Sequence, residues 1–217
     1  MFTNREEAGK LLANKLMDYK DNDHVVILAI PRGGVPIGYE LAKKLHAPLD
    51  VVLSKKIGHP FNREYAIGAV TSKSIILSDA ASEVSKAYID NETEQIRDLL
   101  KKRYESYHGD NEPIELNNKT VILVDDGVAT GNTLISCVQL IASENPSKII
   151  VALPVAPPSA LKKIKEMPEV NEAICLSTPV NFQAVGQFYE AFSQVNDKEV
   201  IALLKKANEN FRLKKSE

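Results

Sequence analysis

The chain has 217 residues and a formal net charge of −2, so it offers no global basic field for nucleic acid. No apolar stretch approaches the roughly 20 residues that span a bilayer, which excludes a membrane-spanning class. The first residues lack the basic and then apolar pattern of a signal sequence, and we expect a cytoplasmic protein. Cys137 and Cys175 form no CxxC pair, so neither a zinc site nor a disulfide framework is predicted.

The N-terminal part predicts an amphipathic helix and then a buried strand. Apolar residues recur at helical spacing between Asn4 and Tyr19, and Asn4 and Glu7 are spaced as an N-terminal capping pair. Residues 25–30 are continuously apolar, which is typical of a strand covered on both faces. We therefore expect this strand inside a parallel sheet.

A glycine-rich loop, Pro31-Arg32-Gly33-Gly34-Val35-Pro36, follows this strand directly. Gly33 and Gly34 allow the backbone to approach a ligand closely, and Arg32 supplies a planar donor suited to phosphate oxygens. A tight turn with a surface arginine is the alternative interpretation. Ligands of open α/β sheets bind beyond the carboxyl ends of the strands, and this loop occupies such a place.

Two lysines follow a third predicted strand, residues 49–53, which comes after a return helix at 37–45. Lys55 and Lys56 are adjacent, and such pairs are most often solvated surface charge. Their position after a strand of the same sheet would place them on the face that carries Arg32. Contact with a phosphorylated ligand is therefore the competing interpretation.

The middle of the chain predicts β-like stretches up to Leu77 and then a helical insertion from about 79 to 110. The segment is polar and charged, with apolar residues at helical spacing from Ile96 to Tyr104. Asn91 and Glu94 are spaced as a capping pair, which predicts a helix start there.

The most informative stretch runs from 121 to 133. Four apolar residues predict a strand buried on both faces, and the acidic pair Asp125 and Asp126 closes it. A turn of small and hydroxyl residues comes next, and a helix begins near Leu134. The turn consists of Gly127, Val128, Ala129, Thr130, Gly131, Asn132 and Thr133.

This order of elements predicts an anion site beside two carboxylates. Turn amides and the first helical N–H groups can converge on a phosphate, with added donors from the threonine hydroxyls. Because carboxylates repel phosphate, Asp125 and Asp126 are better suited to sugar hydroxyls or to hydrated Mg²⁺. The pattern thus favours a phosphorylated sugar over an ordinary strand-to-helix turn, and neither a P-loop nor Gly-x-Gly-x-x-Gly occurs.

The C-terminal part predicts a strand at 149–153, a helix at 159–167, a short strand at 173–176 and a final helix at 197–213. Four aromatic residues precede that last helix, which implies burial against the fold. They are Phe182, Phe188, Tyr189 and Phe192. Core packing is the commoner role of such residues, and stacking on a ligand is the alternative.

The stretch 121–133 resembles the phosphoribosyl-pyrophosphate (PRPP) motif of type I phosphoribosyltransferases. The resemblance implies that Asp125 and Asp126 bind the ribose hydroxyls and that Ala129 to Thr133 enclose the 5′-phosphate. It also implies that the magnesium-bound diphosphate lies at the Arg32-Gly33-Gly34 loop, with Lys55 and Lys56 as further contacts. Asp125 and Asp126 would meet the metal only indirectly, through water or ribose hydroxyls.

Nearly the whole chain is similar to bacterial phosphoribosyltransferase-domain proteins, through the loops above and the aromatic tail. This implies a single domain over 1–217, with a parallel sheet covered by helices on both faces. The core would span about 20–177, and a C-terminal aromatic and helical segment about 178–217 would form the hood over the acceptor. A homo-oligomer, such as a dimer, is expected.

The resemblance implies Mg²⁺-dependent transfer of phosphoribose from PRPP, in nucleotide metabolism, and leaves the acceptor open. The hypoxanthine-guanine pattern has an aspartate directly before Thr-Gly, where this chain has Ala129, so a 6-oxopurine handled in that way is disfavoured. A non-catalytic, regulatory PRPP-binding protein is the main alternative. Other phosphosugar chemistry on the same fold is a third.

Overall fold

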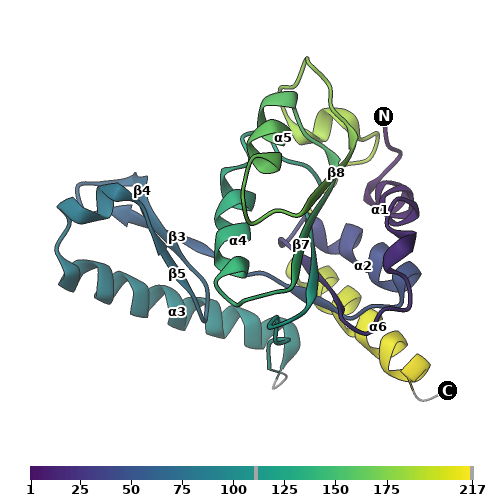
Figure 1. Cartoon of the computed structure of the whole chain (residues 1–217), viewed down its shortest axis with the longest axis horizontal. Helices are drawn as coiled ribbons and strands as arrows, with labels where there is room; N and C mark the ends of the chain where they lie inside the picture. Colours follow the sequence, from purple (N-terminus) through teal and green to yellow (C-terminus); the bar gives the residue numbers. More distant parts are fainter. Residues whose placement is uncertain (110–111, 216–217) are drawn as a thin grey trace.

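Five parallel strands form the central sheet of the computed structural model, which describes residues 1–109 and 112–215 (Figure 1). The strands are β1 (Val25–Ala29), β2 (Leu49–Val51), β6 (Thr120–Val124), β7 (Lys148–Val155) and β8 (Glu172–Ser177). Their order across the sheet is β2-β1-β6-β7-β8. All residues of β1 are buried, as its continuous apolar run requires. The predicted parallel α/β sheet is confirmed.

Helices cover both faces of this sheet. One face carries α1 (Arg5–Asn14), α2 (Gly34–Leu45) and α6 (Asp197–Lys215), and the other carries α4 (Asn132–Ala142) and α5 (Pro158–Lys165) (Figure 1). Alternate strand residues point to opposite faces, so Ile27 and Ile122 join the first core while Leu28 and Leu123 join the second. Both cores are apolar, which fixes the register of the strands.

The first helix begins where the capping pattern predicts. The Asn4 side chain accepts a hydrogen bond from the Glu7 amide at 2.9 Å, so α1 starts at Arg5. The helix ends at Asn14, earlier than expected, and a short 3₁₀ turn, Met17–Tyr19, completes the segment. This start places Arg5 at the first helical position.

Residues 55–108, here called the arm, extend from the central sheet as a separate unit (Figure 1). It contains β3 (Lys55–His59), β4 (Asn62–Val70), β5 (Ile75–Leu77), the 3₁₀ turn Asp79–Glu83 and the long helix α3 (Lys86–His108). The three strands form an antiparallel sheet, which the sequence analysis did not anticipate. The predicted helix start at Asn91 is wrong, because Ser85 caps α3 by accepting from the Tyr88 amide.

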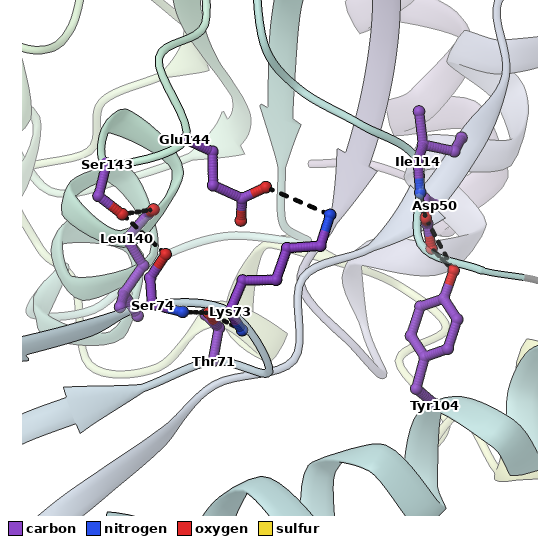
Figure 2. Close-up of polar contacts among 9 residues, drawn as sticks. All are labelled: Asp50, Thr71, Lys73, Ser74, Tyr104, Ile114, Leu140, Ser143 and Glu144. Carbon is purple, nitrogen blue, oxygen red and sulfur yellow. Dashed lines mark hydrogen bonds and ion pairs between the residues drawn. The ribbon is translucent and has the colours of Figure 1, made fainter.

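The inner end of the arm is tied to the core by a buried carboxylate (Figure 2). Asp50 of β2 is only 3% exposed, and the Tyr104 hydroxyl donates to its two oxygens at 3.1 and 2.9 Å. The Ile114 amide donates at 3.0 Å, and His108 Nε2 lies 3.0 Å from Oδ1. A buried carboxylate needs such partners, so Asp50 fixes the end of α3 against the sheet.

A second contact ties the turn between β4 and β5 to the end of α4 (Figure 2). The Ser143 hydroxyl donates to Ser74 Oγ at 2.8 Å, and Lys73 Nζ lies 3.8 Å from a Glu144 carboxylate oxygen. Burial raises the pKa of Glu144, which Lys73 opposes. The arm is therefore held to the core at two separate places.

Tyr104→Phe tests the Asp50 anchor. The variant removes the only hydroxyl among the described residues that donates to this carboxylate, so the free energy of unfolding should fall by about 1–3 kcal/mol. Urea unfolding of the variant and the parent protein measures this difference. Tyr65→Phe is the matched control, because Tyr65 is 53% exposed in the arm. Equal stabilities for Tyr104→Phe and Tyr65→Phe would contradict the anchor.

Candidate active site

Two predicted ligand loops meet at the carboxyl ends of β1 and β6. The Ile30 amide donates to the Val124 carbonyl at 2.9 Å, which continues the pairing of these strands into the loops. A Cβ on Gly33 would lie 2.0 Å from Asp126 Oδ2, and one on Gly34 would lie 2.8 Å from the Val124 carbonyl oxygen. Only glycine allows this approach, so the Arg32-Gly33-Gly34 loop packs directly on the acidic pair.

Arg32 is partly exposed and follows a cis peptide bond with Pro31. Its Nη1 lies 3.7 Å from a carboxylate oxygen of Asp197, the first residue of α6. The guanidinium group is thus near the surface beside the glycine loop, with one long ion pair among the described residues. Such a weak, exposed pair leaves the side chain available to an anionic ligand.

The two carboxylates are in an unfavourable environment for two adjacent charges. Burial and the neighbouring Asp126 charge raise the pKa of Asp125 well above its usual range. Burial also raises the pKa of Asp126, whereas Arg5 lowers it. The Asp126 amide donates to Asp125 Oδ1 at 2.9 Å, which holds the first carboxylate in place. A cation or hydroxyl donors from a ligand would favour the ionised pair.

Arg5 is a partner of the acidic pair that sequence reasoning missed. Its Nε and Nη2 lie 2.8 and 2.7 Å from Asp126 Oδ2, and both side chains are largely buried. The two residues are 121 positions apart, so no local pattern links them. In the sequence, Arg5 is only a charged residue at the start of a helix.

The turn after the acidic pair leaves backbone donors open. Gly131, with φ of 80°, caps α4 and provides no side-chain hydrogen bond, while the first helical amides have no partner within the helix. Thr130, Asn132 and Thr133 are exposed, as is Ala129. Gly127 has φ of 152°, and a Cβ there would lie 2.8 Å from side-chain atoms of Val155 and Val185. The turn is thus closely packed at Gly127, whereas Ala129, Thr130, Asn132 and Thr133 are exposed to solvent.

Lys55 and Lys56 belong to a different element from the loops just described, at the start of β3. They are exposed and pair with Val70 and Ala69 in the antiparallel sheet of the arm, rather than in a loop of the central sheet. In the part of the chain that the structure describes, neither lysine forms an ion pair with the acidic residues. Their contact with a diphosphate remains a prediction.

The aromatic residues of the C-terminal segment differ in the contacts that they make. Phe182 and Phe188 lie with ring centroids 5.0 Å apart and are partly buried against the core. Tyr189 is 5% exposed, and its hydroxyl donates to the Asp126 carbonyl at 2.6 Å. Burial raises the pKa of the Tyr189 hydroxyl, so it stays a neutral donor. Tyr189 therefore holds the backbone of the acidic pair through the Asp126 carbonyl group.

An indirect role of the acidic pair toward Mg²⁺, through water or ribose hydroxyls, stays a prediction. Within residues 1–109 and 112–215, no group of three or more His, Cys, Asp or Glu side chains could hold a metal ion. Asp126 Oδ2 already accepts from Arg5. Mg²⁺ commonly takes one or two carboxylates and completes its shell with water and substrate phosphates, which the oxygen donors of Asp125 and Asp126 allow.

Comparison with known proteins places these features in one family. The family model described as "Phosphoribosyl transferase domain" matches residues 3–185. A Mycobacterium tuberculosis protein (strain CDC 1551), named provisionally as a phosphoribosyl transferase, is 36% identical over 215 residues. That match covers 97% of this chain, whereas the chain spans about half (48%) of the length of its curated relative.

Two solved structures share the fold of this chain. The crystal structure of TT1426 from Thermus thermophilus has a TM-score of 0.82 at 38% identity, covering 94% of this chain and 98% of that one. A Neisseria gonorrhoeae protein solved with bound ppGpp has a TM-score of 0.51 at 16% identity, over 93% and 92% of the two chains, and shows the fold alone. None of the described helices is long and apolar enough to cross a membrane. The chain belongs to the phosphoribosyl transferase domain family.

Proposed function

We propose that the chain is a Mg²⁺-dependent phosphoribosyltransferase that uses PRPP and releases pyrophosphate. The observation that carries this proposal is the packing of the Gly33 backbone on the Asp126 side chain. It brings an arginine-bearing loop next to an acidic pair, which is itself followed by an open phosphate-type turn. A diphosphate, a ribose and a 5′-phosphate are joined in this order in PRPP.

Each part of the donor is assigned to one part of the site. Arg32, Gly33 and Gly34 bind the diphosphate, with Lys55 and Lys56 as further candidates. Asp125 and Asp126 accept hydrogen bonds from the ribose hydroxyls. The 5′-phosphate lies at residues 129–133, where the α4 N-terminus favours negative charge.

Catalysis in this proposal depends on positioning and electrostatics. A nitrogen nucleophile attacks the anomeric carbon as the bond to pyrophosphate breaks, through an oxocarbenium-like transition state. Holding the ribose at Asp125 and Asp126 and the leaving group at Arg32 aligns the two reacting bonds. Bound Mg²⁺ would neutralise charge on the diphosphate. No side chain needs to act as a nucleophile.

The acceptor is proposed only as a nucleobase or related nitrogen compound. Ala129 stands where the hypoxanthine-guanine pattern has its acidic residue, which disfavours a 6-oxopurine bound in that way. The regulatory alternative keeps the PRPP site without turnover. An activity screen separates the two.

Incubation with PRPP, Mg²⁺ and a panel of purine, pyrimidine, nicotinate and amine acceptors should release pyrophosphate with at least one of them. The reason is that the bound donor is already aligned for displacement. A coupled pyrophosphate assay measures the rate, and omission of acceptor is the control. PRPP binding without turnover across the panel would instead favour the regulatory alternative.

Three variants test which part of PRPP each group of site residues binds. Arg32→Ala should weaken pyrophosphate binding, whereas Asp126→Asn and Thr130→Val should weaken ribose 5-phosphate binding. Loss of one charge-assisted contact corresponds to about 1.5–3 kcal/mol, or roughly tenfold to a hundredfold in Kd. Isothermal titration of both ligands measures these effects. If Arg32→Ala weakened ribose 5-phosphate as much as pyrophosphate, the diphosphate assignment of its loop would be wrong.

Gly33→Ala tests the close packing of the two loops. The added methyl group would lie 2.0 Å from Asp126 Oδ2, so the carboxylate or the loop must move and PRPP binding should fall at least about tenfold. Gly109→Ala is a control for general destabilisation, because its φ of +63° is unfavourable for alanine, whereas Gly33 has an ordinary φ of −62°, and because its Cβ meets nothing within 4 Å. Unchanged PRPP binding in Gly33→Ala would contradict the role of this packing.

A further inference from the structure

Arg5 contacts the proposed donor site, although it belongs to neither ligand loop. Two of its N–H groups, on Nε and Nη2, converge on Asp126 Oδ2 at 2.8 and 2.7 Å. The side chains of Arg5 and Asp126 are only 11% and 13% exposed. A guanidinium group held at two nitrogens restricts the carboxylate to one orientation.

The contact leaves the second oxygen of Asp126 for another partner. Among the described residues, no residue other than Asp126 itself donates a hydrogen bond to Oδ1. Oδ2 is enclosed, because a Cβ on Gly33 would lie within 2.0 Å of it, against 3.1 Å for Oδ1. The side chain therefore has one oxygen used by the protein and one oxygen with acceptor capacity to spare.

Arg5 is itself held by the C-terminal segment. Its Nη1 donates to the Ser193 carbonyl at 2.8 Å, and its guanidinium carbon lies 3.8 Å from the centroid of the Phe192 ring. Phe192 stacks on Tyr189 with centroids 5.0 Å apart, and Tyr189 donates to the Asp126 carbonyl. These contacts close a ring that begins and ends at Asp126.

Phe192 is 37% exposed, but one edge of its ring is closely packed on the Gly186 backbone. A Cβ on Gly186 would lie 2.8 Å from a ring carbon of Phe192, so the aromatic platform has little freedom to shift. The Phe2 ring also lies 5.4 Å from the Tyr189 ring, and the Phe2 amide donates to the Phe188 carbonyl at 2.8 Å. The N-terminal and C-terminal segments are thus joined behind the acidic pair.

We propose that Arg5 is a positioning residue of the donor site, which holds Asp126 by Oδ2 so that Oδ1 is presented to the ribose hydroxyls. The inference rests on the proposed function, since it takes the ribose as the ligand of Asp126. Arg5 acts through Asp126 and does not touch the donor. Phe192 and Ser193 hold Arg5, which gives the C-terminal segment a role in donor binding.

The first test compares two ligands that share no chemical group except phosphate. Arg5→Met should weaken ribose 5-phosphate binding about tenfold and leave pyrophosphate binding within about twofold, as measured by isothermal titration. Arg5→Lys keeps the cation with less directional donors and should recover part of the loss. Arg63→Met is the matched control, because Arg63 pairs with Glu92 at 2.7 Å in the arm.

A double-mutant cycle separates positioning from a general structural role. In the Asp126→Asn background, Arg5→Met should change ribose 5-phosphate binding by less than about twofold, because the contact through which Arg5 acts is already altered. Equal effects of Arg5→Met in both backgrounds would overturn the proposal. Tighter ribose 5-phosphate binding by Arg5→Met would also overturn it, since Arg5 would then block the site.

The remaining outcomes are distinguishable. If the parent protein bound neither ribose 5-phosphate nor PRPP, the proposed function and this inference would both fail. If the parent bound ribose 5-phosphate and Arg5→Met bound it equally well, the inference alone would fail. Should Arg5→Met not fold by circular dichroism, Phe192→Leu takes its place in the cycle, because it removes the ring under the guanidinium group and leaves Arg5 present.

Discussion

Two neighbouring carboxylates are held at the end of β6 where water has little access, and the rest of the site is arranged around this constraint. Charges taken out of water need compensation by donors or by an opposite charge. Arg5 supplies the charge and the Asp126 amide supplies a donor to Asp125. Gly33 then provides the room in which the second carboxylate fits. The cost of burying the two carboxylates is thus offset by the Arg5 charge, the Asp126 amide and the space left by Gly33.

Asp50 is another buried carboxylate, and its environment is different. Its oxygens receive a tyrosine hydroxyl and two backbone amides, from Val51 and Ile114, and His108 lies beside it. This carboxylate is enclosed by the protein on all sides, as a structural anchor is. Asp126 has an oxygen to which no other described residue donates, which is the expected state of a group that binds a ligand.

The parallel sheet and the acidic turn could be predicted because each is encoded in a short continuous stretch. Buried strands read as apolar runs, and the strand, acidic pair and turn at 121–133 are adjacent in the chain. Arg5 could not be found in this way, because its partner is 121 residues distant. The β-like stretches up to Leu77 were predicted, but the antiparallel sheet was not, because β3 begins with two exposed lysines and contains a glycine, which a single sequence does not distinguish from a loop. The cap of α3 was misplaced because Asn91 with Glu94 fits the capping pattern better than Ser85, which has Tyr88 three residues later.

The two attachments of the arm limit how the molecule can change shape. Swinging the inner end of α3 outwards would remove the Tyr104 donor from Asp50, and lifting the turn between β4 and β5 would separate Ser74 from Ser143. A movement of the arm would therefore act first on β2 and α4, the elements next to the proposed diphosphate and 5′-phosphate loops.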